Sequence, residues 1–372
     1  MVSAHAGGAF MTNREAQIFQ WIVENPMISQ EELAAKAGIA RSSAAVHISN
    51  LMKKGYILGK GYVTNGPSYC TVIGGANIDI GGVPDAALVD RDSNPGRTVL
   101  SLGGVGRNIA HNMRLLGLDV KLVTAMGDDV YAGQLAKSCR ELGIELQDSV
   151  RIANESTSTY LYIADQDGDM KLALSDMRIY EHITPEYIQN KLELINRGKI
   201  VVIDTNIPAR TVECICEKSK SPVFADPVSG KKAQKLLPVL DKLYAVTPNK
   251  HEAQVLSGVS ISDDADLEKA AEALLRKGVK NVFITLGERG VYCANENEKF
   301  LLEVEAIKAV STTGAGDSFM AGLALGFTKR LSLREMARVG IAAAGITIES
   351  ELTINPMLSL AEVEKRSGIE LL

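Results

Sequence analysis

The sequence has few of the features that would cross-link a chain or carry it through a membrane. Its five cysteines are odd in number and form no CxxC pair, which excludes a disulfide scaffold and predicts reduced thiols in a cytoplasmic protein. The longest apolar run, from Val339 to Ile348, covers about ten residues, whereas a membrane span needs about 20. Residues 1–11 contain neither a charged n-region nor an apolar h-region, so we expect a flexible leader and no signal peptide.

Aromatic residues are scarce and the net charge is small. Aromatics make up 5% of the 372 residues, and 33 glycines favour helices packed on strands over an all-β sandwich. A net charge of −5 is too mild to predict nucleic-acid or membrane binding by the whole chain. Residues 11–64 nevertheless carry a net charge of +2, which leaves −7 for residues 65–372. That difference favours a DNA-binding module attached to an acidic enzyme.

Three short helices and a hairpin are predicted before residue 66. Ser29 and Glu32 form a capping box that opens the second helix. A third helix is expected from Arg41 to Lys54, and a hairpin over residues 56–64 with a basic glycine turn follows it. Residues 65–68 are rich in turn formers and predict a linker, so the chain divides into two domains there.

This order of elements in residues 12–66 resembles the winged helix-turn-helix of bacterial transcriptional regulators. In that family the third helix enters the major groove and the wing touches phosphates, so the resemblance implies DNA binding. The candidate DNA-binding residues are Arg41, Ser43, His47 and Lys60. A packing or dimerisation module without DNA contacts is the alternative, because +2 is a low charge for a protein that binds phosphates.

From Tyr69 onward, apolar strands alternate with amphipathic helices. We expect strands at residues 71–73, 120–124, 200–203, 222–225, 243–246 and 282–285, and helices between them such as 106–116 and 267–277. This alternation predicts βαβ units, and therefore an α/β fold with a mostly parallel sheet covered on both faces. Ligands in such sheets bind beyond the carboxyl ends of the strands.

The segment from Ser311 to Phe319 has the composition of an anion site. Gly314, Ala315 and Gly316 let backbone N–H groups converge, and Asp317 opens an apolar helix. The orphan N–H groups and the dipole of a helix N-terminus suit a phosphoryl group. An aspartate beside that anion is suited to be a general base, which takes the proton of an attacking hydroxyl. A glycine turn with an aspartate N-cap is the alternative.

Further polar segments follow predicted strands at residues 73–79, 247–252 and 285–290, and a glycine pair at residues 103–104 opens a predicted helix. In the first segment, Asn77 and Asp79 are suited to bind vicinal hydroxyls. The glycine pair allows close backbone approach, and Asn108 lies on the first turn of the helix, facing the same end of the sheet. In the segment at residues 247–252, Asn249 and Glu252 lie three residues apart on one helix face.

These segments, in this order, resemble the ribokinase-like (PfkB) family of carbohydrate and nucleoside kinases. The signatures are Gly103 to Ala110 and Thr313 to Asp317. The resemblance implies a three-layer αβα fold over residues 67–372, a small β lid that includes residues 82–100 and 156–176, ATP as co-substrate, and Mg²⁺. It also implies roles: Asp317 as catalytic base; Gly314, Ala315 and Gly316 as anion hole; Asn77, Asp79, Gly103, Gly104, Asn108 and Asn206 for the acceptor; Asn249, Thr285, Gly287 and Gly290 for ATP; Glu252 for Mg²⁺ through water.

Two positions depart from the family pattern. Asn206 stands where ribokinase-like enzymes often carry a glutamate near the sugar, and a plain turn residue at a strand end is the alternative. Ser311 stands where many members carry an acid that helps to hold a monovalent cation. Backbone carbonyls then remain as ligands, so K⁺ activation stays open.

The amino-acid sequences of several segments are most similar to those of pseudouridine kinases. These segments are GGVGRNIA, the DTN-Ile-Pro stretch, and Thr347 to Glu351 with Asn355-Pro356. The resemblance implies phosphorylation of the 5′-hydroxyl of pseudouridine; another nucleoside, ribose or a keto-sugar is the alternative. A transcriptional regulator that senses such a ligand is a further alternative, although Asp317 and the glycines of an active kinase are present. Because winged-helix modules bind paired half-sites, we expect a homodimer.

Overall fold

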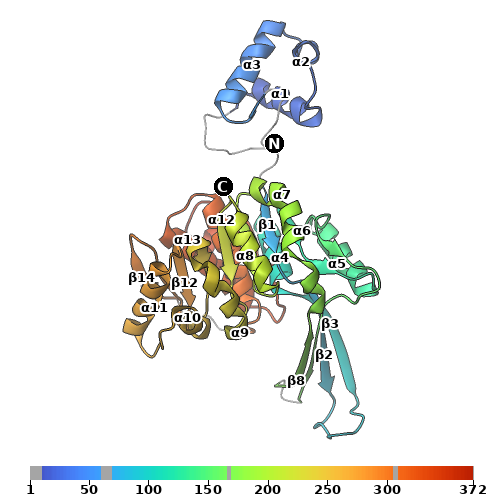
Figure 1. Ribbon diagram of the computed structural model, residues 1–372, viewed down its shortest axis with the longest axis vertical. Coiled ribbons are helices and arrows are strands. Elements are labelled where there is room, and N and C mark those ends of the chain that lie inside the picture. The colour runs from blue at the N-terminus through green and yellow to red at the C-terminus, as the bar shows by residue number, and fades with distance from the viewer. Residues whose placement is uncertain (1–10, 60–68, 166–168, 305–308, 372) are drawn as a thin grey trace. The chain divides into compact units, whose positions relative to one another are not determined.

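The computed structural model describes residues 11–59, 69–165, 169–304 and 309–371 (Figure 1). Contacts divide the chain into two compact units, residues 1–68 and 69–372. Three predicted segments lie outside the described residues: residues 1–10 of the leader, the hairpin from Lys60 on, and the lid turn at residues 166–168.

Within residues 11–59, the first unit has three helices around a small apolar core. They are α1 (Asn13–Glu24), α2 (Gln30–Ala37) and α3 (Arg41–Lys53). The predicted capping box opens α2, because Ser29 Oγ accepts from the Glu32 N–H and the Glu32 carboxylate accepts from the Ser29 N–H. The core consists of Ile18, Ile22, Ile28, Leu33, Ile48, Leu51, Tyr56 and Ile57.

The second unit is built on an eight-stranded sheet with the order β14-β13-β12-β11-β10-β9-β1-β4. The strands are β1 (Cys70–Ile73), β4 (Val120–Val123), β9 (Val201–Asp204), β10 (Val223–Asp226), β11 (Leu243–Val246), β12 (Asn281–Thr285), β13 (Val291–Ala294) and β14 (Lys299–Leu302). β4, β1, β9, β10, β11 and β12 pair in parallel, and β13 and β14 are added antiparallel, so the predicted mostly parallel sheet is confirmed.

Helices cover both faces of this sheet because its strands are apolar on both sides. One core joins strand residues such as Val72 and Val202 to α4 (Val105–Leu115), α5 (Val130–Glu141), α12 (Ala315–Thr328), α13 (Leu333–Ile348) and α14 (Leu360–Ser367). The other core joins their neighbours Ile73 and Ile203 to α6 (Pro185–Asn190), α7 (Leu192–Arg197), α8 (Ala209–Lys218), α10 (Lys250–Ser257) and α11 (Asp264–Arg276). The result is a three-layer αβα unit.

The remaining elements are short. They are α9 (Gly230–Ala233), β5 (Ala125–Met126), β6 (Val150–Arg151) and the 3₁₀ helices η1 (Arg178–His182), η2 (Gln234–Lys242) and η3 (Gly287–Arg289). The apolar run from Val339 to Ile348 forms the buried end of α13. None of the helices in the described ranges is both long and apolar enough to cross a membrane. All five cysteines, Cys70, Cys139, Cys214, Cys216 and Cys293, are buried free thiols.

A second sheet of four strands projects from this αβα unit (Figure 1). Its order is β3-β2-β7-β8, with β2 (Asn77–Pro84), β3 (Gly96–Gly103), β7 (Thr159–Ala164) and β8 (Met170–Asp176). The sequence interpretation placed the segment at residues 73–79 directly after a first strand at residues 71–73. The strand β1 does end at Ile73, and Asn77 and Asp79 then lie on β2, a strand of the second sheet that was not predicted.

Candidate active site

The predicted base and one predicted acceptor ligand meet at the carboxyl end of the large sheet. Asn108 lies on the first turn of α4 and Asp317 on the first turn of α12. Asn108 Nδ2 donates a hydrogen bond to Asp317 Oδ2 at 2.9 Å, across 209 positions of sequence. Both side chains are buried. The fold therefore brings together two motifs that stand far apart in the chain.

The environment of Asp317 makes its carboxylate more basic than that of an ordinary aspartate. Burial raises the pKa of Asp317 well above its ordinary value, and the carboxylates of Asp226 and Asp204 raise it further, while the Asn108 amide opposes them. A raised pKa is what a carboxylate needs to accept a proton from a hydroxyl, since a stronger base transfers protons more effectively. Geometry and charge are thus compatible with the predicted base.

Asp204 holds two loops that carry predicted acceptor residues, and sequence reasoning did not assign it a role. It is fully buried at the end of β9 and accepts from the backbone N–H groups of Gly75 at 2.7 Å and Asn206 at 2.8 Å. Gly74 must be glycine, because a Cβ there would lie 2.3 Å from Asp204 Oδ2. The carboxylate directly after a predicted strand was the signal that could have identified Asp204.

The glycine segment forms a helix N-terminus with unpaired donors. The helix begins at Ala315, so Asp317 lies within its first turn and does not open it as expected. The first bond inside the helix runs from the Ser318 N–H to the Gly314 carbonyl at 3.0 Å, which leaves the N–H groups of Gly316 and Asp317 without partners in the helix. Gly314 has φ +83° and its missing Cβ would lie 2.2 Å from the Thr353 carbonyl oxygen.

Asn249 and Glu252 form a capping box instead of a shared helix face. The Asn249 N–H donates to Glu252 Oε2 and the Glu252 N–H donates to Asn249 Oδ1, both at 2.9 Å. Glu252 is buried, which raises its pKa. Burial, together with the charges of Glu252 and Asp204, raises the pKa of Asp226 to about 7. Asp226, at the end of β10, was another residue that the motifs did not reveal.

These carboxylates fit a hydrated Mg²⁺ better than a directly caged metal. Within the described part of the chain, no three His, Cys, Asp or Glu side chains gather to hold a metal ion by themselves. Asp226 and Glu252 lie close enough to repel each other, and a cation would relieve that repulsion. Mg²⁺ keeps several of its waters and needs one or two carboxylates, so this pair suits it.

The predicted nucleotide residues lie together beside this pair. Asn249 forms a bridge with Thr285, whose N–H donates to the Pro248 carbonyl at 2.9 Å. Gly287 and Gly290 both have positive φ, and the Gly290 Cβ would lie 2.1 Å from the Leu302 carbonyl oxygen. The tight turn at residues 286–290 therefore depends on glycine.

Among the residues predicted to bind the acceptor, Asn77 contacts Asp79. Asn77 Nδ2 donates to Asp79 Oδ1 at 2.5 Å, and burial raises the pKa of Asp79 to about 6. A Cβ on Gly103 would lie 2.2 Å from Asp79 Oδ2, and Gly104 has φ +96°. The glycine pair thus leaves room for this carboxylate and opens α4 beside it.

Substituting Asp226 with asparagine is expected to stabilise the protein at high pH. The ordinary pKa of 3.8 rises to about 7 in the folded protein, so between these values the folded state binds a proton that the unfolded chain has released. The free energy of unfolding consequently falls as pH rises through that range. D226N removes this effect, so Tm should rise by at least about 2 °C at pH 8 and not at pH 4. Thermal denaturation at both pH values measures this change in Tm, and Asp128→Asn, at an exposed aspartate, is the control. An equal change in Tm at pH 8 and at pH 4 would contradict the prediction.

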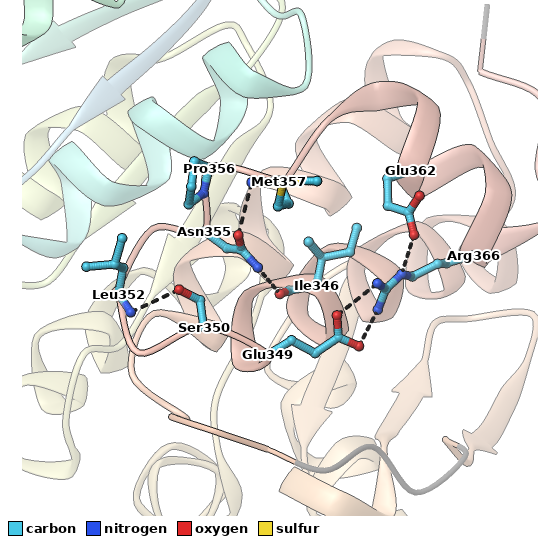
Figure 2. Close-up of a pocket in the computed structure, with 9 residues that line it drawn as sticks. All are labelled: Ile346, Glu349, Ser350, Leu352, Asn355, Pro356, Met357, Glu362 and Arg366. Atoms are coloured by element: carbon cyan, nitrogen blue, oxygen red, sulfur yellow. Dashed lines mark hydrogen bonds and ion pairs between the residues drawn. The ribbon is translucent and has the colours of Figure 1, made fainter.

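A cavity of about 430 Å³ lies elsewhere, between the end of α13, the loop at residues 350–357 and α14 (Figure 2). Figure 2 shows its polar groups engaged with one another: Arg366 lies between Glu349 and Glu362, at 2.8–2.9 Å from their oxygens. Asn355 Nδ2 donates to the Ile346 carbonyl at 2.6 Å. None of the predicted site residues lines this cavity, so we do not assign the acceptor to it.

In the first unit, the predicted DNA-binding residues differ in exposure. Arg41 is exposed and lies 3.3 Å from the Glu31 carboxylate. Ser43 and His47 are half-buried, and His47 Nδ1 is a buried atom without a hydrogen-bond partner. The exposed face of α3 carries Ser42 and Val46 instead, because the helical phase turns them outward. Lys60 lies outside the described residues.

Two protein-family models match the sequence of this chain. The model described as "pfkB family carbohydrate kinase" matches residues 67–360. The chain belongs to the pfkB family of carbohydrate kinases. A second model, "Winged helix-turn-helix DNA-binding", matches residues 16–57. The resemblance to ribokinase-like enzymes is therefore confirmed for the second unit, and the winged-helix module for the first.

Individual pfkB family members are similar over most of the chain. An uncharacterized sugar kinase of Escherichia coli K12, YeiI, is 40% identical over 94% of this chain and 97% of its own length. The pseudouridine kinase of the same organism is 35% identical over 79% of this chain and 95% of its own. The ribokinase of Arabidopsis thaliana, solved with ribose and ATP, shares the fold with a TM-score of 0.72, covering 82% of this chain and 99% of its own, at 22% identity.

Proposed function

We propose that this pfkB family kinase transfers the γ-phosphoryl group of ATP to the 5′-hydroxyl of a nucleoside, pseudouridine in particular. The observation that carries this proposal is the buried Asp317, held by Asn108 beside the unpaired N–H groups at the start of α12. A base and an anion-binding site within one helical turn are what phosphoryl transfer to a hydroxyl needs. The likeness to a pseudouridine kinase supports the choice of acceptor.

In the proposed reaction, Asp317 takes the proton of the acceptor hydroxyl, whose oxygen attacks the γ-phosphorus in line. The bond from that phosphorus to the bridging oxygen breaks, and ADP leaves with the electron pair. The N–H groups of Gly316 and Asp317 stabilise the charge on the phosphoryl oxygens. Mg²⁺, when bound through water by Glu252 and Asp226, would neutralise phosphate charge; Asn249, Thr285, Gly287 and Gly290 would hold the nucleotide.

Acceptor binding is proposed for Asn77, Asp79, Gly103, Gly104, Asn108 and Asn206. The lid sheet, β3-β2-β7-β8, carries Asn77 and Asp79 on β2, so its position determines where their side chains lie. Closure of such a lid over the acceptor would exclude water, which otherwise competes as nucleophile. We also propose that the protein is a cytoplasmic homodimer. Activation by K⁺ stays open, and it would use backbone carbonyls near Ser311 as ligands of the cation.

Turnover of a panel of acceptors tests the proposal. ATP consumption with Mg²⁺ is measured for pseudouridine, uridine, other nucleosides, ribose and keto-sugars. Preferential turnover of pseudouridine is expected. Preferential turnover of another acceptor would support the phosphoryl-transfer mechanism but contradict the assignment to the pseudouridine kinases. Binding of a ligand without any turnover would instead favour a transcriptional regulator that senses it.

A second proposed function, DNA binding by the first unit, is favoured by the winged-helix family match. We expect Arg41→Ala combined with Lys60→Ala to weaken binding to the promoter region of the protein's own gene by about tenfold or more, because phosphate contacts supply most of the affinity. Gel shifts at two salt concentrations measure it. The matched control is Lys137→Ala with Arg140→Ala, which removes two cations from α5. An unchanged, salt-sensitive shift in the first variant would contradict the prediction.

A further inference from the structure

Tyr180 ties the end of the lid sheet to the segment from which that sheet begins. It lies on η1, which follows the last lid strand, β8. Its phenol O–H donates a hydrogen bond to the Ala76 carbonyl at 2.8 Å, and Ala76 stands directly before Asn77, the first residue of β2. Tyr180 and Ala76 are each 1% exposed, so water has little access to replace this bond.

The Tyr180 hydroxyl is the donor of this bond. Burial raises the pKa of Tyr180, and the carboxylates of Asp204 and Asp79 raise it further. The phenol therefore keeps its proton, and a backbone carbonyl can only accept a hydrogen bond. Removing the hydroxyl would leave the Ala76 carbonyl without this partner.

The backbone on both sides of Ala76 is bonded as well. The bonds are Gly75 N–H to Asp204 Oδ2 at 2.7 Å, Arg107 N–H to the Gly75 carbonyl at 2.9 Å, and Ile78 N–H to the Ser158 carbonyl at 3.0 Å. These partners belong to β9, to α4 and to the residue before β7, whereas Tyr180 follows β8. The segment at residues 75–78 is thus held where the lid strands join the αβα unit.

The position of the Ala76 carbonyl determines where β2 begins. A peptide group is planar and rigid, so the Ala76 carbonyl and the Asn77 N–H move as one unit. Asn77 Nδ2 in turn donates to Asp79 Oδ1, and both side chains are proposed to bind the acceptor. A shift of the Ala76 carbonyl is therefore passed on to Asn77 and Asp79.

We propose that Tyr180 is a positioning residue, which holds the base of the lid so that Asn77 and Asp79 bind the acceptor and water is excluded. This inference rests on the proposed kinase activity. Without the hydroxyl, the buried Ala76 carbonyl stays unpaired or moves to another donor, and the loss of such a bond costs about tenfold in an equilibrium constant.

A displaced lid base also admits water as a competing nucleophile. The water oxygen then attacks the γ-phosphorus, the bond to the bridging oxygen breaks, and ADP, inorganic phosphate and a proton are released. ATP is consumed in this way without a phosphorylated acceptor. The ratio of ADP to phosphorylated acceptor therefore reports how well the lid is positioned.

The substitution Tyr180→Phe removes only the hydroxyl and tests this inference. Kinetics are measured with ATP, Mg²⁺ and pseudouridine, or with the acceptor of the panel that the wild type prefers. We expect the acceptor KM to rise about tenfold and the ATP KM to stay unchanged. We also expect Y180F to form more ADP than phosphorylated acceptor, with inorganic phosphate as the difference, whereas the wild type forms equal amounts. A merely structural role would lower Tm and the active fraction but would change neither KM nor the product ratio.

Tyr187→Phe is the matched control. The Tyr187 O–H also donates to a backbone carbonyl, that of Asp148 at 2.9 Å, but Tyr187 lies on α6, outside the lid. Y187F loses the same kind of bond, so it should keep the wild-type acceptor KM and product ratio if the effect of Y180F comes from the lid.

Ala76→Gly is a second variant, for use if melting temperatures show that Y180F fails to fold. Glycine gives the same segment more backbone freedom without changing Tyr180, so KM and the product ratio should change in the same direction. A folded Y180F, or in its place a folded A76G, with the wild-type acceptor KM and product ratio would overturn the inference alone. A wild-type protein that phosphorylates none of the acceptors would overturn the proposed function, and this inference with it.

Discussion

Replacing Asp317 with asparagine is expected to lower kcat by at least about 10²-fold, with a modest change in acceptor affinity. Asparagine has nearly the same size and can still bond to Asn108, but it cannot take the proton of the acceptor hydroxyl. The wild-type enzyme should also lose kcat/KM as pH falls, because protonation of the raised-pKa carboxyl removes the base. The variant should lack that dependence. Steady-state kinetics over a pH series measures both effects.

The control for this substitution is Asp128→Asn, which changes an exposed carboxylate outside the site. Acceptor affinity is measured without ATP by calorimetry, so that a loss of binding is distinguished from a loss of chemistry. Near-normal turnover by D317N would refute the assignment of the base. A large loss of acceptor affinity with little change in kcat would instead make Asp317 a binding residue.

Replacing Gly314 with alanine is expected to lower kcat by about 10²-fold or more. Gly314 has φ +83°, and a Cβ there would lie 2.2 Å from the Thr353 carbonyl oxygen. The added methyl group must displace the start of α12 or the loop at residues 350–357. Either displacement moves the N–H groups that would stabilise the transferring phosphoryl group, and loss of one such donor costs about 10²–10³-fold.

Gly316→Ala is the matched comparison, because nothing lies within 4 Å of its Cβ position and the N–H is retained. It should therefore lose much less activity than G314A. Melting temperatures of both variants separate a local displacement from global unfolding. A folded G314A with near wild-type kcat would show that the position of this helix N-terminus does not control the reaction.

Local chemistry in the sequence predicted much of the fold. Alternating apolar segments predicted the mostly parallel sheet, and the capping box at Ser29 and Glu32 predicted the start of α2, because both depend on residues close in the chain. The strand β2, which carries Asn77, was not predicted, because its pairing with β3 and β7 depends on residues far apart in the chain. The periodicity of a single segment does not predict which distant strands it pairs with.

The candidate site was predictable where a motif combines glycines with a polar side chain. Residues 313–317 and 103–108 are such motifs, and Asn108 does meet Asp317 in the structure. Asp204 and Asp226 were missed, since each is a single polar residue that becomes part of the candidate site only through burial among groups of distant elements. The helical phase of α3 likewise turned Ser43 and His47 partly inward, which residue type alone did not indicate.

The most direct test of the central claim follows the transferred phosphoryl group. Wild-type protein and D317N are incubated with ATP, Mg²⁺ and pseudouridine, and the products are identified by mass spectrometry and NMR. The account predicts that the wild type forms ADP and pseudouridine 5′-phosphate in equal amounts, and that D317N forms at least about 10²-fold less. ATP hydrolysis without a phosphorylated acceptor, or equal product formation by D317N, would contradict it.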